Sequence, residues 1–224
     1  MEPNLNPNII LEAVCGSHAY GLDTPESDID LKGVFVAPTQ SILSLRKPRE
    51  TIDRTDPDVC YHEVEKFIRL AMKCNPTILE MLFLDDYNIL TQEGQLLVDS
   101  RKAFLSDMVR NAYHGYVFSQ VRKLNSRGDS WDVGMKNRYK KHSRHLFRLL
   151  DQGKQLLETG TLDVKVKNRD ELFAIGELTV DKLIDKFTIE FKKFENIKSI
   201  LPKEPDYNRI NNILLYIRKK NYAA

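Results

Sequence analysis

The most informative segment of the chain reads Cys15-Gly16-Ser17-His18-Ala19-Tyr20-Gly21-Leu22-Asp23-Thr24-Pro25-Glu26-Ser27-Asp28-Ile29-Asp30-Leu31-Lys32-Gly33. A Gly-Ser pair follows an apolar stretch, and an Asp-x-Asp pair comes after ten further residues. From Ser27 to Val36 polar and apolar side chains alternate at first, and the segment then becomes continuously apolar. This pattern predicts a strand that enters a buried sheet. On such a strand the side chains of Asp28 and Asp30 point the same way.

Together, Gly16, Ser17, Asp28 and Asp30 predict a phosphate site beside a metal site. Two carboxylates on one face repel each other unless a cation lies between them. Oxygen ligands suit Mg²⁺, which completes its octahedron with the phosphate oxygens of a nucleotide. Gly16 lets backbone amides approach a phosphate, and the Ser17 hydroxyl can donate to a phosphate oxygen at the start of the next helix.

The Gly16-Ser17 and Asp28-x-Asp30 pattern resembles the signature of the DNA polymerase β-like nucleotidyltransferase superfamily. The longer segment resembles the predicted nucleotidyltransferases that are associated with RNA-ligase repair operons. The likeness continues through the following segments of this chain: Glu63-Val64-Glu65-Lys66-Phe67, Asn75-Pro76-Thr77-Ile78-Leu79-Glu80-Met81-Leu82, Lys141-His142-Ser143-Arg144-His145-Leu146-Phe147-Arg148-Leu149-Leu150, and Leu201-Pro202.

The resemblance implies an α+β (α/β) fold, with a mixed sheet flanked by helices and a mostly helical C-terminal part. It also implies an enzyme that uses two Mg²⁺ ions, or Mn²⁺ in their place, to transfer a nucleoside monophosphate from an NTP and release pyrophosphate. Asp28 and Asp30 would be catalytic metal ligands in this chemistry, together with a third carboxylate from a neighbouring strand. Asp58 is the choice for that third carboxylate, and the alternatives Asp53, Glu63 and Glu80 stay open.

The charge of the chain divides sharply along its length. Residues 1–99 carry 8 Lys and Arg against 17 Asp and Glu, whereas residues 100–224 carry 26 against 15. An acidic half suits cations, and a basic half suits phosphates or a polynucleotide. The alternative is that the two halves simply attract each other.

The densest basic run, from Met135 to Arg148, contains no acid. On a helix Lys141, His145 and Arg148 form one stripe. We expect this stripe to face the two aspartates and to contact the phosphates of the NTP or the acceptor. The alternative is a solvated basic face without a ligand.

The rest of the chain predicts two parts, a catalytic domain over 1–100 and a helical domain over 101–224. In the first part we expect a helix over 8–13, capped by Asn6 and Pro7, strands over 51–54 and 58–62, and helices over 63–73 and 77–84. In the second part, helices are expected over 104–124, 136–158, 169–196 and 208–219, separated by Gly and Pro positions.

Composition favours a cytoplasmic protein. The longest apolar runs fall far short of the roughly 20 residues of a membrane helix, and no export signal is visible. Cys15, Cys60 and Cys74 lack a C-x-x-C spacing, so reduced thiols and no structural zinc are expected. The expected partners are an NTP and an RNA or tRNA-like acceptor, with no membrane.

A second function stays open. A non-catalytic, antitoxin-like or regulatory module would keep the fold and hold a basic protein partner on its acidic face. A nucleotidyltransferase for small cationic acceptors is disfavoured by the basic second half. His18 and Tyr20 are expected to make local contacts rather than touch substrate, and Trp131 is either a base platform or a lid over apolar surface.

Overall fold

The computed structural model describes residues 7–45, 47–125 and 133–222. Within these ranges the chain forms a five-stranded sheet in the order β3-β4-β2-β1-β5. The strands are β1 (Asn8–Cys15), β2 (Asp30–Val36), β3 (Thr51–Thr55), β4 (Asp58–Glu63) and β5 (Ile89–Leu90). β2 and β4 are parallel, whereas the other pairs are antiparallel. The mixed sheet and the helices around it confirm the predicted α+β class.

The segment predicted as a helix over 8–13 is instead strand β1. Its side chains alternate toward burial, with Leu11, Ala13 and Cys15 fully covered. β1 pairs with β2 on one side and with β5 on the other. The helix prediction relied on Pro7, but the β-branched residues Ile9, Ile10 and Val14 favour a strand buried between neighbours.

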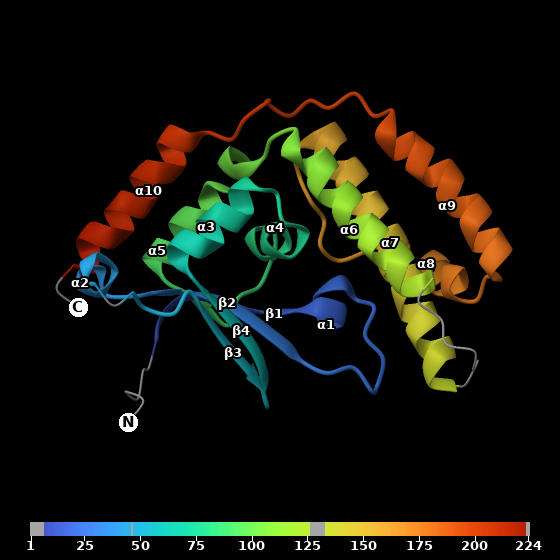
Figure 1. Ribbon diagram of the computed structural model, residues 1–224, viewed down its shortest axis with the longest axis horizontal. Helices are drawn as coiled ribbons and strands as arrows, with labels where there is room; N and C mark the ends of the chain where they lie inside the picture. The colour runs from blue at the N-terminus through green and yellow to red at the C-terminus, as the bar shows by residue number, and fades with distance from the viewer. Residues whose placement is uncertain (1–6, 46, 126–132, 223–224) are drawn as a thin grey trace.

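Four helices cover one face of the sheet (Figure 1). They are α3 (Val64–Met72), α4 (Pro76–Leu82), α5 (Gln92–Asp99) and α10 (Tyr207–Lys220). The buried residues of α3 are Val64, Phe67, Ile68 and Ala71, which is the spacing of one helix face. The short helices α2 (Thr39–Leu43) and η1 (Arg101–Phe104) complete this part.

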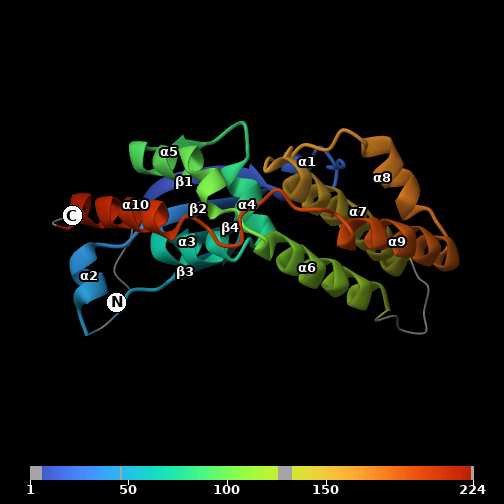
Figure 2. The same cartoon turned by 90° about the horizontal axis from the view of Figure 1, so that it is seen from above.

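The helical part lies beyond one end of the sheet and contains α6 (Met108–Asn125), α7 (Val133–Thr159), α8 (Arg169–Gly176) and α9 (Val180–Glu195) (Figure 2). The helix predicted over 169–196 is thus two helices, because the chain leaves α8 after Gly176 and starts again at Thr179. The short helix α1 (Gly16–Tyr20) lies between the sheet and this helical part.

One continuous hydrophobic core joins the inner face of the sheet to the helical part. The prediction placed α10 in the second part, yet α10 packs against α3 and α5 of the first, and also against η1, which begins just after the predicted boundary. Near its C-terminal end the chain therefore returns to the part of the molecule that contains the sheet (Figure 1). Among the described helices, none combines the length and apolar character needed to cross a membrane.

Candidate active site

The Gly-Ser turn packs directly on one of the predicted aspartates. β1 ends at Cys15, which pairs with Asp30 of β2, and the chain turns into α1 at Gly16. Gly16 has a φ of +68°, a conformation that residues with a Cβ rarely adopt. A Cβ at this position would also overlap a carboxylate oxygen of Asp30. Glycine is therefore required here for the approach of Asp30 as well as for the turn.

The parallel pairing of β2 with β4 brings a second carboxylate to the same place. Leu31 pairs with Val59, so Asp30 and Asp58 stand side by side at the start of their strands. Their side chains are hydrogen-bonded to each other. Burial raises the pKa of Asp30, and the adjacent Asp58 raises it further, while the ammonium groups of Lys32 and Lys141 act in the opposite direction. The site therefore concentrates negative charge that its own lysines only partly offset.

Asp28 does not lie where it was expected. β2 begins at Asp30, and Asp28 is an exposed residue in the segment before the strand. The prediction that both aspartates share a strand face is wrong, because the ladder with β1 ends at the Cys15–Asp30 pair. Within the described residues, no three acidic, histidine or cysteine side chains converge as a ready metal-binding group. A metal role for Asp28 stays a prediction.

Two carboxylate groups from the protein are nevertheless enough to bind Mg²⁺ when a nucleotide supplies further oxygen ligands. This ion is usually bound by one or two carboxylates together with substrate phosphates, and it keeps several waters. The carboxyl groups of Asp30 and Asp58 already share a hydrogen bond, so a cation between them would replace a proton that two adjacent acids otherwise need. The residues present therefore fit a hard divalent cation.

The expected phosphate ligands on the other side of the site are only partly in place. The Ser17 side chain is half-buried in the first turn of α1 and makes no hydrogen bond with any residue that the structure describes. Lys141 is exposed on α7, and its charge acts to lower the pKa of Asp30. That Ser17 and Lys141 bind a phosphate stays a prediction.

Arg148 is not available as a phosphate ligand in this structure. Its side chain is 1% exposed and is paired with Glu80 of α4. Its guanidinium also donates to Gln152 at 2.7 Å and lies 3.6 Å from the centre of the Tyr20 ring. The predicted stripe is therefore corrected: Arg148 is not part of it, because the helix turns this side chain into the core, where Glu80 compensates its charge.

His145 belongs to this buried group as well. Its Nδ1 accepts a hydrogen bond of 2.8 Å from Arg148, which fixes the neutral form of the ring. Burial holds the pKa of His145 well below its usual value, and the nearby Arg148 lowers it further. The expectation that His145 contacts a phosphate as part of the stripe is therefore not supported by its surroundings.

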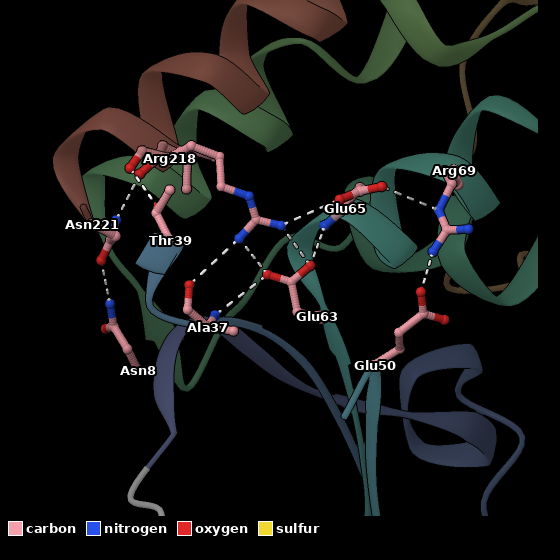
Figure 3. A network of polar contacts seen from close by, with 10 residues as sticks. Asn8, Ala37, Thr39, Glu50, Glu63, Glu65, Arg69, Arg218 and Asn221 are labelled. Atoms are coloured by element: carbon pink, nitrogen blue, oxygen red, sulfur yellow. Dashed lines mark hydrogen bonds and ion pairs between the residues drawn. The ribbon is translucent and has the colours of Figure 1, made fainter. Parts of the chain in front are cut away.

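The alternatives for the third carboxylate lie elsewhere. Glu63 accepts two hydrogen bonds from Arg218, at 2.7 and 2.8 Å, and caps α3 through the backbone amide of Glu65 (Figure 3). Glu80 is held by Arg148 and by the Tyr20 hydroxyl at 2.7 Å. Asp53 on β3 is hydrogen-bonded by Cys60. Among the four candidates in the described part of the chain, Asp58 is the one in contact with Asp30.

The structure also describes the surroundings of His18 and Tyr20. The His18 ring contacts the carbonyl of Ser27 at 3.3 Å and the carboxylate of Asp23 at 3.7 Å, so its contacts are local. Tyr20 is packed against the core and bonded to Glu80. Trp131 lies outside the described residues.

One residue near the site was missed by sequence reasoning. Lys32 stands two residues after Asp30 on β2, and its charge acts on Asp30 and on Cys60 of β4. The alternation of side chains along a strand would have placed it on the face of Asp30. The Glu80–Arg148 pair gave no comparable signal, because its members are 68 residues apart.

Two proteins, one from a bacteriophage and one from a bacterium, are similar in sequence to this chain. The chain is 29% identical over 133 residues to an uncharacterized 38.9 kDa protein in the nrdC-mobD intergenic region of Enterobacteria phage T4, a match that covers 53% of this chain and 39% of that protein. It is 28% identical over 119 residues to the uncharacterized protein YcgL of Bacillus subtilis (strain 168), covering 51% and 45%. The matches thus span less than half the length of these relatives.

The family comparison covers nearly the whole chain. Residues 1–211 match the family described as RNA repair pathway DNA polymerase beta family, RlaP. This range includes the Gly-Ser turn, the aspartates, the sheet and the helical part. The chain therefore belongs to the RNA repair pathway DNA polymerase beta family, whose type of fold is that of the polymerase β-like nucleotidyltransferases.

Proposed function

We propose that this protein is a Mg²⁺-dependent nucleotidyltransferase that moves a nucleoside monophosphate from an NTP to a hydroxyl of an RNA end. The observation that carries the proposal is the contact of Gly16 and Asp58 with Asp30 at one end of the sheet, where the charge of Lys141 of α7 also acts on Asp30. A binding module has no physical need for two half-exposed carboxyl groups in contact, since their repulsion is unfavourable without a cation.

The reaction is a displacement at the α-phosphorus of the NTP. The acceptor hydroxyl oxygen forms a bond to this phosphorus, the bond to the bridging α–β oxygen breaks, and pyrophosphate leaves with that oxygen. The hydroxyl proton passes to Asp58, which is exposed and can release it to water. Asp30 and Asp58, with Asp28 as the expected further ligand, would hold Mg²⁺, and the ion would supply stabilisation of the charge that develops on the phosphate oxygens.

The other residues of the site orient the substrate. Ser17 donates its hydroxyl proton to a phosphate oxygen, and Lys141 compensates the charge of the triphosphate from the opposite side. The close packing of Gly16 on Asp30 fixes the distance between the phosphate site and the carboxylates. An RNA acceptor is supported by the RNA repair pathway named in the family description and by the basic second half of the chain.

The test is a labelling assay with purified protein. The protein is incubated with Mg²⁺, total cellular RNA and each of the four α-labelled NTPs, and the labelled pool is identified. We expect label on RNA, and Asp30→Asn should reduce the rate by on the order of a thousandfold. The matched control is Asp181→Asn, which removes an exposed acid of α9.

Two results would overturn the proposal. One is transfer that Asp30→Asn leaves unchanged, which would place the chemistry elsewhere. The other is the absence of label in RNA, protein and small-molecule pools with all four NTPs, which would favour the non-catalytic module.

A further inference from the structure

A cavity of about 200 Å³ lies next to the carboxylate pair, on the side of the sheet that the helices cover. Its floor includes Lys32 of β2 and Cys60 of β4, which pair with each other across the two strands. Each of them stands two residues after an acid of the site, Asp30 or Asp58. Because alternate residues of a strand share a face, the cavity is continuous with the face that carries the carboxylates.

The walls of the cavity are mainly apolar. Leu70 of α3 and Ile78 and Met81 of α4 line it. Thr77 adds a hydroxyl group, and His62 of β4 adds an imidazole ring. The volume is below the roughly 300–1,000 Å³ of pockets that hold drug-sized ligands, so it suits one ring system rather than a larger molecule. A small apolar cavity with a few polar groups at its edge is the environment that a nucleobase needs.

The far wall is fixed before any ligand enters. Asn75, at the start of α4, donates to the Tyr116 hydroxyl of α6 at 2.7 Å, and both residues line the cavity. Asn75 also caps α4 through the backbone amide of Ile78. The cavity is therefore bounded by two helices that are held together, and its shape does not depend on the order of a loop.

Lys32 gives the cavity its charge. The side chain is half-buried, and within the described part of the chain it makes no hydrogen bond or ion pair with an acid. A partly desolvated ammonium group is unfavourable without a partner, and a phosphate supplies one. The groups of the cavity thus match the two halves of a nucleotide, an apolar surface for the base and a cation for the phosphate.

We propose that this cavity binds the base of a single nucleotide whose phosphate contacts Lys32. The inference rests on the proposed function of the adjacent carboxylates, which it deepens by naming where a nucleotide lies. The nucleotide has two possible sources, the donor NTP and the terminal nucleotide of an RNA acceptor, and the two are separated by experiment.

Binding is measured by calorimetry without divalent metal, so that no turnover occurs. The probes are the four nucleosides and their 5′-monophosphates. Thr77→Phe fills the cavity and should weaken the binding of both kinds of probe by about tenfold or more. Lys32→Met keeps the aliphatic stem and should weaken the monophosphates by about tenfold but leave the nucleosides unchanged. Lys32→Arg should restore the monophosphates.

Two controls accompany these variants. Lys182→Met removes an exposed lysine of α9 and should leave all affinities unchanged. Leu70→Phe fills the same cavity from α3. Circular dichroism shows whether each variant folds, and Leu70→Phe replaces Thr77→Phe in the test if the latter does not fold.

The source of the nucleotide follows from two further probes. These are an NTP analogue with a methylene group between the α- and β-phosphates and a 5′-phosphorylated RNA dinucleotide. If Thr77→Phe weakens the NTP analogue, the cavity holds the donor base. If it weakens the dinucleotide and leaves the NTP analogue unchanged, the cavity holds the end of the acceptor.

The proposal is overturned if the wild-type protein binds no monophosphate at millimolar concentration. It is also overturned if both cavity-filling variants bind monophosphates as the wild type does. This failure is distinct from a failure of the proposed function, because the labelling assay reports transfer and these titrations report binding without transfer.

Discussion

The two ends of α1 contact two different pairs of charged residues. At the start of the helix, Gly16 packs on Asp30, which meets a second acid, Asp58. At its end, Tyr20 donates to Glu80, which meets the base Arg148. The second pair is complementary and almost fully buried, whereas the first is half-exposed and has like charge. The contrast separates a pair that completes the core from a pair that is complete only when a cation and phosphates arrive.

The largest effect on stability is expected at the buried pair. Arg148→Met leaves the Glu80 carboxylate buried without its partner and should lower the free energy of unfolding by about 3–5 kcal/mol. Denaturant unfolding monitored by circular dichroism measures this loss. The double variant Glu80→Leu with Arg148→Met is the control and should recover much of it, because two apolar side chains replace a matched pair. A loss below about 1 kcal/mol for the single variant would show that the pair is solvated.

A smaller loss is expected at the start of α1. Gly16→Ala places a Cβ against Asp30 in a left-handed conformation, which should cost about 1–3 kcal/mol and displace the carboxylate. The matched control is Gly115→Ala in α6, where no atom lies within 4 Å of the new Cβ. The control should raise stability by about 0.5–1 kcal/mol, because alanine is the better helix residue. Thermal unfolding of both variants measures the difference, and equal shifts would contradict the close packing of Gly16.

The next prediction concerns Lys141, the exposed cation of α7 whose charge acts on Asp30. Lys141→Ala should raise KM for the NTP by about tenfold, the effect of losing one charged hydrogen bond to a phosphate. Its unfolding free energy should change by less than about 0.5 kcal/mol, because the side chain is exposed. Lys182→Ala on α9 provides the comparison. If KM stayed constant and RNA binding lost about one unit of salt slope instead, Lys141 would contact the acceptor.

The smallest effect is a pH dependence at the buried pair. His145 stays neutral in the folded protein because burial holds its pKa well below 6.5, the value the unfolded chain retains. Only the unfolded state then takes up the proton, so stability should fall by about 1 kcal/mol as the pH drops by one unit below 6.5. His145→Gln keeps an acceptor for Arg148 and should flatten this part of the profile. If stability changed with pH between pH 7 and pH 5 in the same way in the wild type and in His145→Gln, His145 would be protonated in the folded state.

The sequence by itself determined the elements whose signals are local. The Gly16-Ser17 turn, the strand that runs through Asp30–Val36 and the amphipathic helix α3 follow from neighbouring residues and their spacing, although the exact start of the strand does not. The acid that lies against Asp30 could be predicted as one of four, with Asp58 as the choice, since a short polar–apolar run at Asp58 is typical of a strand. The unequal charge of the two halves could also be predicted, because it needs only a count of charged residues along the chain.

Only the tertiary structure decided which of these residues meet. The position of Asp58 against Asp30 depends on the parallel register of β2 and β4, which a spacing within one strand does not contain. β1 is a strand because partners lie on both sides of it, although its short apolar run alone suited a helix. Arg148 looked like a ligand in a basic run and is a core residue, because Glu80, 68 residues earlier, meets it. Local patterns fix what a segment can form, whereas burial and pairing across the fold fix the environment of each charge.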